Sequence, residues 1–269
     1  RGRLLVRGVD KDGAQKKYRI NYKPSLFVPV GKETKYKTLD GRNVEKIKFD
    51  SIPESTKWVN EYKNVTNFEY FGNTRHQYPF IADEFSGKID WDLSQIKLLS
   101  IDIECESENG FPSPEKADQP LICITVKDHT SKLIIVFGMG NFVNDREDVQ
   151  YINCSSETHL VETFTKFWVE YNPDIITGWN VKFFDIPYLM NRFRYLMGDE
   201  WLNQFSPWGI VEQKSASVLF ASREQQVWNI MGVDTLDYLD LYRKFTFVRR
   251  ESYKPVSYTH LRAHETGSY

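Results

Sequence analysis

The most constraining feature of the sequence is a short apolar run, Lys97–Cys105, that has two acids set into it. Its Leu and Ile residues are typical of a buried strand. Because side chains alternate across a strand, Asp102 and Glu104 point to one face, while Ile101 and Ile103 point into the core. Two neighbouring carboxylates repel each other, and burial raises that cost. The pattern favours a cation against the pair, and oxygen-ligated Mg²⁺ or Mn²⁺ is the natural choice.

The pair also has a plainer interpretation, a strand end that emerges into water with two solvated acids. A third acid, Asp185, follows an expected strand at Ile175–Asn180 and precedes a helix that has Pro187 in its first turn. Asp before a helix is commonly an N-cap, a role that can coexist with metal binding. If the two strands are neighbours, Asp102, Glu104 and Asp185 converge on a pocket where two metal ions activate a water that cuts a phosphodiester.

Strand and helix patterns extend along the second part of the chain. We expect strands at 97–105, 121–126, 133–137 and 175–179, a helix that is capped by Ser155 or Ser156 and stopped at Tyr171–Pro173, and a helix at 186–197. The order strand, strand, strand, helix, strand, helix is how a ribonuclease-H-like α/β fold begins.

The first part of the chain has a different pattern. Residues 1–50 resemble short strands joined by turns, and Pro53–Tyr62 fits a short helix with Ser51 as its cap. We place a soft boundary near residue 96. The expected fold class is therefore α/β (α+β), with a smaller, mostly-β N-terminal domain at 1–96 before a ribonuclease-H-like domain at 97–254.

Charge and cysteine content narrow the class of protein. Residues 1–50 hold 14 Lys and Arg against 6 Asp and Glu, although the net charge of the whole chain is −2. A basic segment suits phosphate contact, but a solvated face without a partner is the plainer interpretation. The three cysteines, Cys105, Cys123 and Cys154, are an odd set without zinc-site spacing, which argues against a disulfide framework. We expect no membrane span, and we interpret the opening RGRLLVRG as a truncated start rather than a signal peptide.

Two of these acidic segments resemble motifs of family B DNA polymerases, most closely those of T-even-type bacteriophages. The first exonuclease motif of that family, Asp-x-Glu, stands here at Ile101–Glu104, and the second stands at Gly178–Tyr188 as GWNVKFFDIPY. Leu236–Phe245 and Tyr22–Phe27 are also similar to the phage enzymes. The similarity covers roughly residues 15 to 253.

The resemblance implies a role for each site residue. Asp102 and Asp185 would hold the catalytic metals, and Glu104 would bind one metal and help orient the attacking water. The complete site would hold two divalent ions, Mg²⁺ or Mn²⁺. The residues that would contact DNA are Phe111, which packs against the unpaired 3′ end, and Asn180 and Phe184, which line the single-strand pocket. Loop packing is the alternative for Phe111.

The resemblance also marks other segments. Residues near Val211–Val227 occupy the place of a hairpin that helps to separate primer from template, and Asp237 and Asp240 are structural rather than catalytic. The fourth carboxylate, from a Tyr-x3-Asp motif, and the polymerase palm would lie beyond Tyr253. We interpret residues 255–269 as a non-native tail and exclude the histidines at 260 and 264 from any metal site.

These observations predict the N-terminal fragment of a DNA-directed DNA polymerase of DNA replication. Its 3′→5′ proofreading exonuclease would remove mispaired 3′-terminal nucleotides by metal-assisted hydrolysis, although we expect the fragment itself to be weakly active or inactive. The alternative is a non-catalytic single-stranded nucleic-acid-binding module, which the basic opening and the many aromatic residues would suit. A free-standing exonuclease would need the fourth carboxylate and then an early stop.

The resemblance also implies the partners. They are the 3′ end of single-stranded DNA, primer–template DNA, RNA at the N-terminal domain, and a sliding clamp through a C-terminus beyond this chain. We expect a viral replication protein that works in the cytoplasm of the host cell, is not secreted and has no membrane contact.

Overall fold

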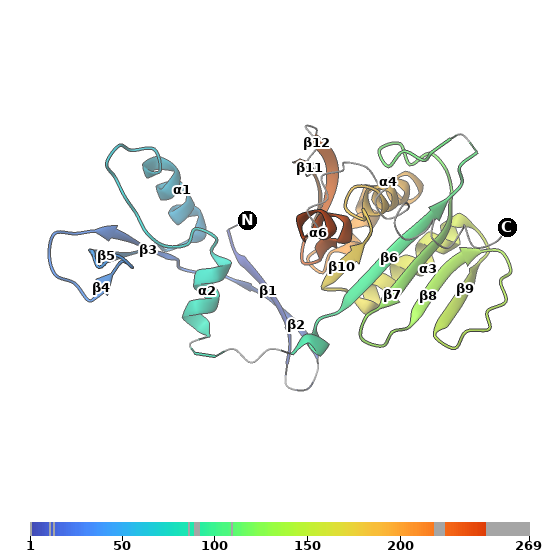
Figure 1. Ribbon diagram of the computed structural model, residues 1–269, viewed down its shortest axis with the longest axis horizontal. Coiled ribbons are helices and arrows are strands. Elements are labelled where there is room, and N and C mark those ends of the chain that lie inside the picture. The colour runs from blue at the N-terminus through green and yellow to red at the C-terminus, as the bar shows by residue number, and fades with distance from the viewer. Residues whose placement is uncertain are drawn as a thin grey trace. The chain divides into compact units, whose positions relative to one another are not determined.

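The computed structural model describes residues 2–10, 12, 14–85, 87–88, 92–108, 110–217 and 224–245 (Figure 1). The chain divides into two compact units, Arg1–Asp92 and Leu93–Tyr269. We call them the first and the second unit and describe each by itself. The domain limits expected from the sequence, 1–96 and 97–254, remain a prediction, and the tail at 255–269 lies outside the described residues.

The first unit consists of short strands, as its pattern predicts, and of two helices, of which the sequence predicted one. Strands β1 and β2 pair with each other, and β3, β5 and β4 form a second sheet in that order. Helix α1 begins where predicted, because the Ser51 side chain accepts a hydrogen bond from the Glu54 N–H at 3.3 Å. The elements are β1 Leu4–Val9, β2 Gln15–Ile20, β3 Ser25–Pro29, β4 Tyr36–Lys37, β5 Asn43–Lys48, α1 Ile52–Tyr62 and α2 Gln77–Glu84.

Helix α2 was not expected from the sequence. It is only 8 residues long, too short to show a helical period clearly. Tertiary packing stabilises it, since Phe80 is buried with its ring 5.7 Å from that of Tyr22. The Tyr22 hydroxyl also donates to Asp83 at 2.5 Å.

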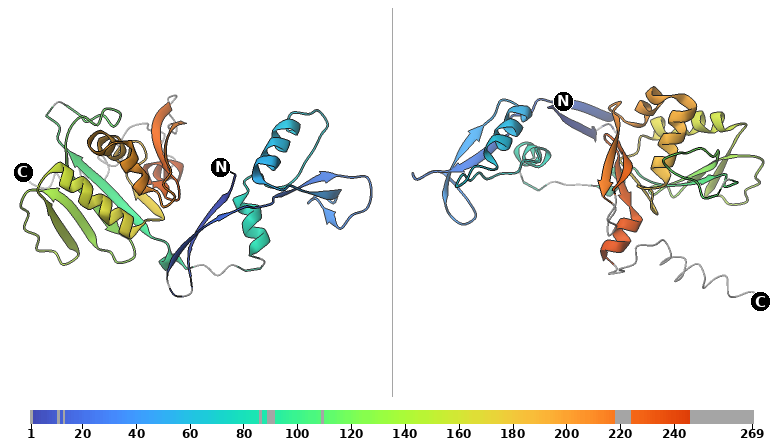
Figure 2. Two further views of the ribbon diagram at one scale, coloured as in Figure 1. Left: turned by 180° about the vertical axis from the view of Figure 1, so that it is seen from behind. Right: turned by 90° about the horizontal axis from the view of Figure 1, so that it is seen from above.

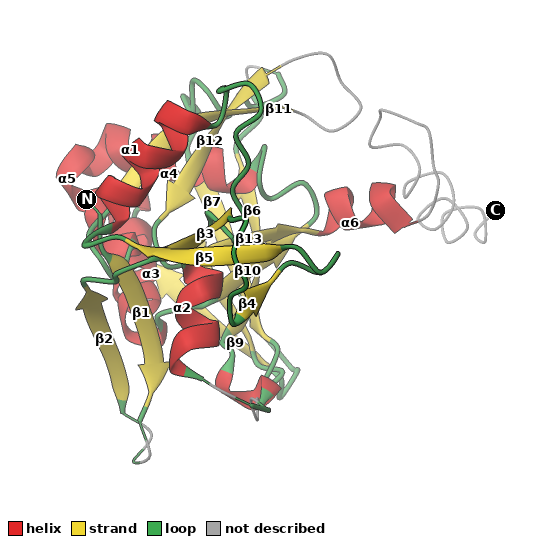
Figure 3. Ribbon diagram, turned by 90° about the vertical axis from the view of Figure 1, so that its left-hand side faces the viewer, coloured by secondary structure: helices red, strands yellow, loops and turns green. Residues whose placement is uncertain are grey.

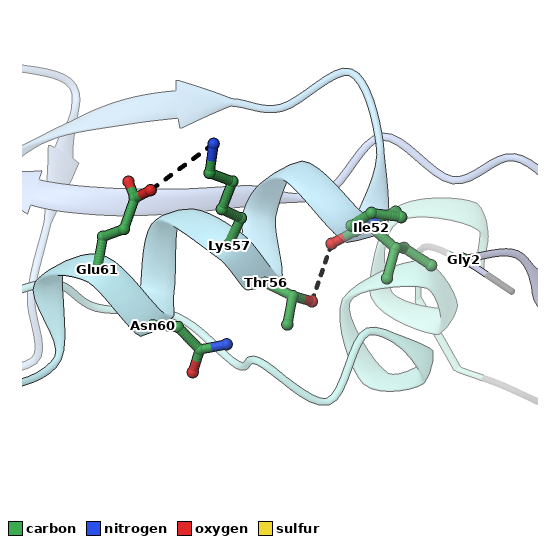
Figure 4. Close-up of a pocket in the computed structure, with 7 residues that line it drawn as sticks. Gly2, Ile52, Thr56, Lys57, Asn60 and Glu61 are labelled. Atoms are coloured by element: carbon green, nitrogen blue, oxygen red, sulfur yellow. Dashed lines mark hydrogen bonds and ion pairs between the residues drawn. The ribbon is translucent and has the colours of Figure 1, made fainter.

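A pocket in the first unit lies along helix α1 (Figure 4). The Thr56 hydroxyl donates to the Ile52 carbonyl at 2.9 Å, and Lys57 pairs with Glu61 at 3.8 Å, so these polar groups are engaged within the helix. The lining residues are Gly2, Ile52, Pro53, Thr56, Lys57, Asn60 and Glu61. With a single acid that is already paired, this pocket does not offer the chemistry predicted above.

The second unit is built on a six-stranded mixed sheet with the order β13-β10-β6-β7-β8-β9. Strands β6, β10 and β13 run parallel to one another, β7 is antiparallel to both of its neighbours, and β9 is parallel to β8. The strands are β6 Leu98–Cys105, β7 Leu121–Asp128, β8 Ile134–Met139, β9 Val149–Cys154, β10 Ile175–Gly178 and β13 Asp234–Asp237. This arrangement confirms the expected ribonuclease-H-like α/β class.

Strand β9 is one strand more than the sequence pattern predicted. Its sequence, VQYINC, interrupts the apolar residues with Gln150 and Asn153, which are exposed at the edge of the sheet. An edge strand buries less surface than a central one, so its hydrophobic signal is weaker. The expected order therefore gains a fourth strand before the first helix.

Helices α3 and α4 of the second unit pack against one face of this sheet, where they share one core. Helix α3 crosses behind β7, β8 and β9 in Figure 1 and in front of them in the reverse view of Figure 2. Ser156 caps it, accepting from the His159 N–H at 3.2 Å, as predicted. Strand β13 leads directly into α6 (Figure 3). The remaining elements are η1 Leu93–Gln95, α3 Glu157–Tyr171, α4 Asp185–Met197, α5 Asp199–Leu202, η2 Asn203–Phe205, β11 Val211–Ser217, β12 Glu224–Ile230 and α6 Tyr238–Phe245.

The core of the second unit joins alternate residues of β6 to the inner faces of α3 and α4. Leu99 is fully buried, as are Phe164 of α3 and Phe193 of α4. The three cysteines are free, as their odd number and scattered positions predicted. Among the described residues no helix is long and apolar enough to span a membrane.

Candidate active site at the carboxyl end of strand β6

The two acids of the first motif lie on the exposed face of β6. Asp102 and Glu104 are exposed, whereas Ile101 and Ile103 are 3% and 6% exposed and pack in the core. This alternation confirms the predicted orientation of the strand. The pairing with β7 shifts register immediately after Glu104. Such bulges bend a strand and re-aim its side chains, and they recur next to active sites.

Strand β10 runs beside β6 at unusually close range. Ile175 pairs with Leu98, and the register continues as far as Thr177, which pairs with Ser100. A Cβ atom built on Gly178 would lie 2.7 Å from the carbonyl oxygen of Ile101, so only glycine allows the two strands to approach this closely here. Gly178 opens the second motif, and it brings that motif next to Asp102.

Asp185 reaches β6 from the first residue of helix α4. It is 4% exposed, and its Oδ1 accepts a hydrogen bond from the backbone N–H of Ile103 at 3.2 Å. Ile103 stands between Asp102 and Glu104, so the structure brings the third acid against the strand that carries the other two. The N-cap position belongs to Phe184, and no side chain caps the helix there. The N-cap alternative for Asp185 is therefore not what the structure has.

The electrostatics of this site are those of crowded acids. Burial, with the charge of Asp102 and then of Asp237, raises the pKa of Asp185 to about 7. Asp102 is exposed, but partial desolvation of its carboxyl group also raises its pKa. Among the described residues, no Lys, Arg or His forms an ion pair with Asp102, Glu104 or Asp185. The site holds acids whose charge the protein does not neutralise.

The chemistry of these donors fits a hard divalent cation. Three carboxylates supply the oxygen ligands that Mg²⁺ and Mn²⁺ prefer, and a cation would offset the repulsion between Asp102 and Asp185. The side chains are not already closed around one point, because no group of three potential ligands in the described part of the chain is close enough to hold a metal ion.

Asp237, which is not one of the predicted metal ligands, accepts the hydrogen bonds that shape the loop between β10 and α4. It is 4% exposed and accepts hydrogen bonds from the N–H groups of Asn180 at 3.0 Å, Lys182 at 3.0 Å and Leu239 at 2.8 Å. Asn180 is buried and has a φ of 60°, in the left-handed region that asparagine tolerates. These bonds support the structural interpretation of Asp237, and they fix the loop that leads to Asp185.

An aromatic row extends from α4 to an exposed loop. The ring of Tyr188 stacks on that of Phe184 at 6.0 Å, and Phe184 lies 5.4 Å from Phe111. Phe111 is 85% exposed, which is high for a phenylalanine. An exposed ring that rests on a second ring offers a free face for a base to stack on.

The remaining predicted segments include a hairpin, Asp240 and the histidines. Strands β11 and β12 form an antiparallel hairpin at the place that the resemblance implied, with the tip, 218–223, outside the described residues. Lys182 pairs with Asp240 at 3.6 Å. Among the histidines, His129 forms a partly buried hydrogen bond with Ser100 at 2.7 Å, and His159 forms an exposed one with Ser155 at 3.2 Å. Burial lowers the pKa of His76.

Sequence reasoning missed a buried polar face of helix α4. Tyr188, Asn191 and Arg192 are all buried, and each donates a hydrogen bond to the loop that carries Phe111. The available signal was two polar residues at helical spacing from Tyr188, on a helix face that also carries apolar residues, because a buried arginine requires a partner.

Comparisons of the sequence with known proteins identify its family. Residues 54–256 match the family described as DNA polymerase family B, exonuclease domain. The chain is 28% identical to the DNA-directed DNA polymerase of Escherichia phage RB69, with 93% of this chain and 30% of that protein covered. It is also 28% identical to the DNA-directed DNA polymerase of Enterobacteria phage T4, with 98% and 31% covered.

Similarity extends beyond phages. The DNA polymerase delta catalytic subunit of Candida albicans is 33% identical over 62% of this chain and 16% of its own length. The chain thus spans less than a third of each of these relatives. Because the family match covers three quarters of the chain and includes both acidic motifs, the chain belongs to family B of the DNA polymerases and carries that family's exonuclease domain.

Proposed function

We propose that this chain is the N-terminal part of a replicative DNA-directed DNA polymerase and that its second unit is the 3′→5′ proofreading exonuclease. The observation that supports it best is the hydrogen bond from Ile103 to Asp185, which joins the two acidic motifs at one end of the sheet. A buried acid whose pKa is raised beside a second acid is seldom kept without a function that uses it.

The proposed reaction is hydrolysis of the phosphodiester at a 3′ terminus. Asp102, Glu104 and Asp185 would hold Mg²⁺ or Mn²⁺, which when bound supplies the charge that activates water and stabilises the leaving oxygen. Glu104, exposed beside the bulge, would accept a proton from the attacking water and orient it. The protein contributes position and charge and no covalent nucleophile.

The substrate would be a single-stranded 3′ end of DNA. Phe111 would stack on the terminal base, and Asn180 and Phe184 would line the pocket beneath it. Stacking suits proofreading because every base has an aromatic face, so the site tolerates any terminal nucleotide. Primer–template DNA would bind the complete enzyme, where the β11–β12 hairpin would help to separate the strands.

Other partners rest on the resemblance alone. RNA contact in the first unit would use its basic strands, such as β2, whose Lys16 and Lys17 are exposed. A sliding clamp would bind outside this chain. The phage relatives favour work in the cytoplasm of an infected host cell.

The decisive experiment is the double variant Asp102→Ala with Asp185→Ala in the complete polymerase. We expect Mg²⁺-dependent trimming of a labelled single-stranded oligonucleotide to disappear, while binding of that oligonucleotide in EDTA remains. Unchanged trimming would refute the exonuclease site. If neither the original protein nor the variant trims but both bind, the chain is instead a non-catalytic single-stranded nucleic-acid-binding module.

A further inference from the structure

Helix α4, which begins with Asp185, also holds the loop that carries Phe111. Three of its buried side chains share one face, because they are three and four residues apart. Each donates to a different carbonyl of the loop: Tyr188 Oη to Gln119 at 2.6 Å, Asn191 Nδ2 to Pro114 at 2.7 Å and Arg192 Nη1 to Ala117 at 3.1 Å. One helical face thus binds the loop at three points.

Arg192 is itself anchored on helix α3. Its Nε and Nη2 donate to the two carboxylate oxygens of Glu157 at 2.7 and 2.6 Å. Glu157 Oε1 also accepts from the N–H of Leu121, the first residue of β7, at 2.7 Å. A bidentate pair of this kind fixes direction as well as distance. The end of the loop is therefore tied to both helices.

The network continues to the residue beside Phe111. The Gln119 carbonyl accepts from Tyr188, and the Gln119 side chain donates from Nε2 to the carbonyl of Gly110 at 3.1 Å. Gln119 thus connects helix α4 to the far side of the loop. The neck of the loop is closed by the Glu106 N–H, which donates to Pro120 at 2.9 Å. The exposed ring of Phe111 is thus attached to a loop whose backbone is fixed by hydrogen bonds.

We propose that Tyr188, Asn191 and Arg192 are positioning residues that set Phe111 at a fixed place relative to Asp185. One rigid helix then positions both the ring on which the terminal base stacks and the acid at which the phosphodiester is cut. A base platform that is already in place avoids the cost of ordering the loop on binding. This inference rests on the proposed function of the site.

The test measures how tightly the chain binds a 3′ end when it cannot cut. The probe is a short single-stranded DNA oligonucleotide with 2-aminopurine as its 3′-terminal base, titrated in EDTA and followed by fluorescence. We expect Phe111→Ala to raise Kd about 5- to 100-fold, the range of base stacking. Tyr188→Phe and Asn191→Ala should each raise it about 2- to 10-fold, the range of one lost hydrogen bond.

Tyr188→Phe is the mildest variant because it removes one hydroxyl and keeps the ring on Phe184. Asn203→Ala is the matched control, since this exposed asparagine lies in η2, outside helix α4 and outside the loop that carries Phe111. Its Kd should equal that of the original chain. Arg192 is not replaced, because its loss would leave the partly buried Glu157 without its partner. Melting temperatures of all variants show whether each one folds.

A double-mutant cycle separates positioning from a general structural effect. If Tyr188 and Asn191 act through Phe111, their substitutions should not weaken binding further once Phe111 is alanine. Fully additive effects, or normal binding by both single variants, would overturn the inference while Phe111→Ala still weakens binding. If Phe111→Ala itself binds normally, the stacking role in the proposed function fails instead.

Discussion

The two ends of strand β6 use carboxylates in opposite ways. Asp128, the last residue of β7, lies beside the amino end of β6, where it pairs with Leu99. Its carboxylate accepts hydrogen bonds from the Thr130 N–H, the Ser131 N–H and hydroxyl, and the Tyr171 hydroxyl. At the carboxyl end, Asp185 receives one backbone bond, from Ile103, and faces Asp102. Hydrogen-bond donors surround Asp128, whereas the charge of a second acid, Asp102, acts on Asp185.

The pKa values of these two acids diverge accordingly. Burial alone would raise the pKa of Asp128, but the hydrogen bonds from Ser131, Tyr171 and the turn outweigh it and lower the pKa to about 2. Burial and a neighbouring charge raise the pKa of Asp185 to about 7. The first arrangement stabilises the fold at neutral pH, and the second weakens it. An acid that costs stability is a better candidate for function than one that supplies it.

The largest expected difference between the two ends of β6 is in exonuclease activity. Asp185→Asn should lower trimming of a single-stranded 3′ end by about a hundredfold to a thousandfold, the scale of losing one electrostatic contact with the transition state. Asp128→Asn, the matched change beside the other end of β6, should retain activity. The measurement is the initial rate with Mg²⁺ in the complete polymerase. Equal losses in the two variants would mean that the ends do not differ in function.

Stability should respond to pH in opposite directions at the two ends. Asp185 has a raised pKa, so the folded chain binds more protons than the unfolded chain between about pH 4 and 7, and stability falls as pH rises through that window. In EDTA at pH 8, Asp185→Asn should therefore be more stable than the original chain, by roughly 3 kcal/mol. Urea unfolding followed by circular dichroism checks this. A variant that is less stable at pH 8 would contradict the crowding of acids.

Asp237 sharpens the comparison because it is a satisfied acid at the functional end. Asp237→Asn replaces one carboxylate oxygen by an N–H₂ group that cannot accept a backbone N–H, so unfolding free energy should fall by about 2 kcal/mol. Asp240→Asn, which affects only the partly exposed pair with Lys182, should cost about 0.5 kcal/mol or less. The midpoint of urea unfolding at pH 7 separates them. Equal midpoints would show that the three bonds to Asp237 add little.

The expected loss of stability at Asp128 is smaller than that at Asp237. Because its pKa is lowered in the folded chain, its contribution is present above about pH 4 and is lost as pH falls toward 2. Asp128→Asn should cost about 1 kcal/mol at pH 7, discounted for partial exposure, and the difference from the original chain should vanish near pH 2. A difference that persists unchanged at low pH would place the effect elsewhere than in the charge of Asp128.

The sequence was sufficient for features that depend on neighbours in the chain. The orientation of Asp102 and Glu104 follows from alternation along one strand, and the caps at Ser51 and Ser156 follow from local hydrogen bonding. The arrival of Asp185 beside β6 could be expected because parallel strands place their carboxyl ends at one edge of a sheet.

Features set by distant contacts could not be predicted. Helix α2 forms because Phe80 finds Tyr22, about sixty positions away, and strand β9 forms because the edge of β8 is available. The bonds from α4 to the Phe111 loop depend on the path of that loop, which no local pattern encodes. The roles of the site residues and the domain limits remain predictions.

The bond between Asp185 and Ile103 joins positions 82 apart in the chain. A parallel neighbour cannot be reached by a tight turn, so strands β7 to β9 and helix α3 must be made before β10 can pair with β6. A nascent chain on the ribosome therefore exposes two of the acids well before the third arrives. The cutting chemistry proposed for this end of the sheet is withheld until translation has passed helix α4.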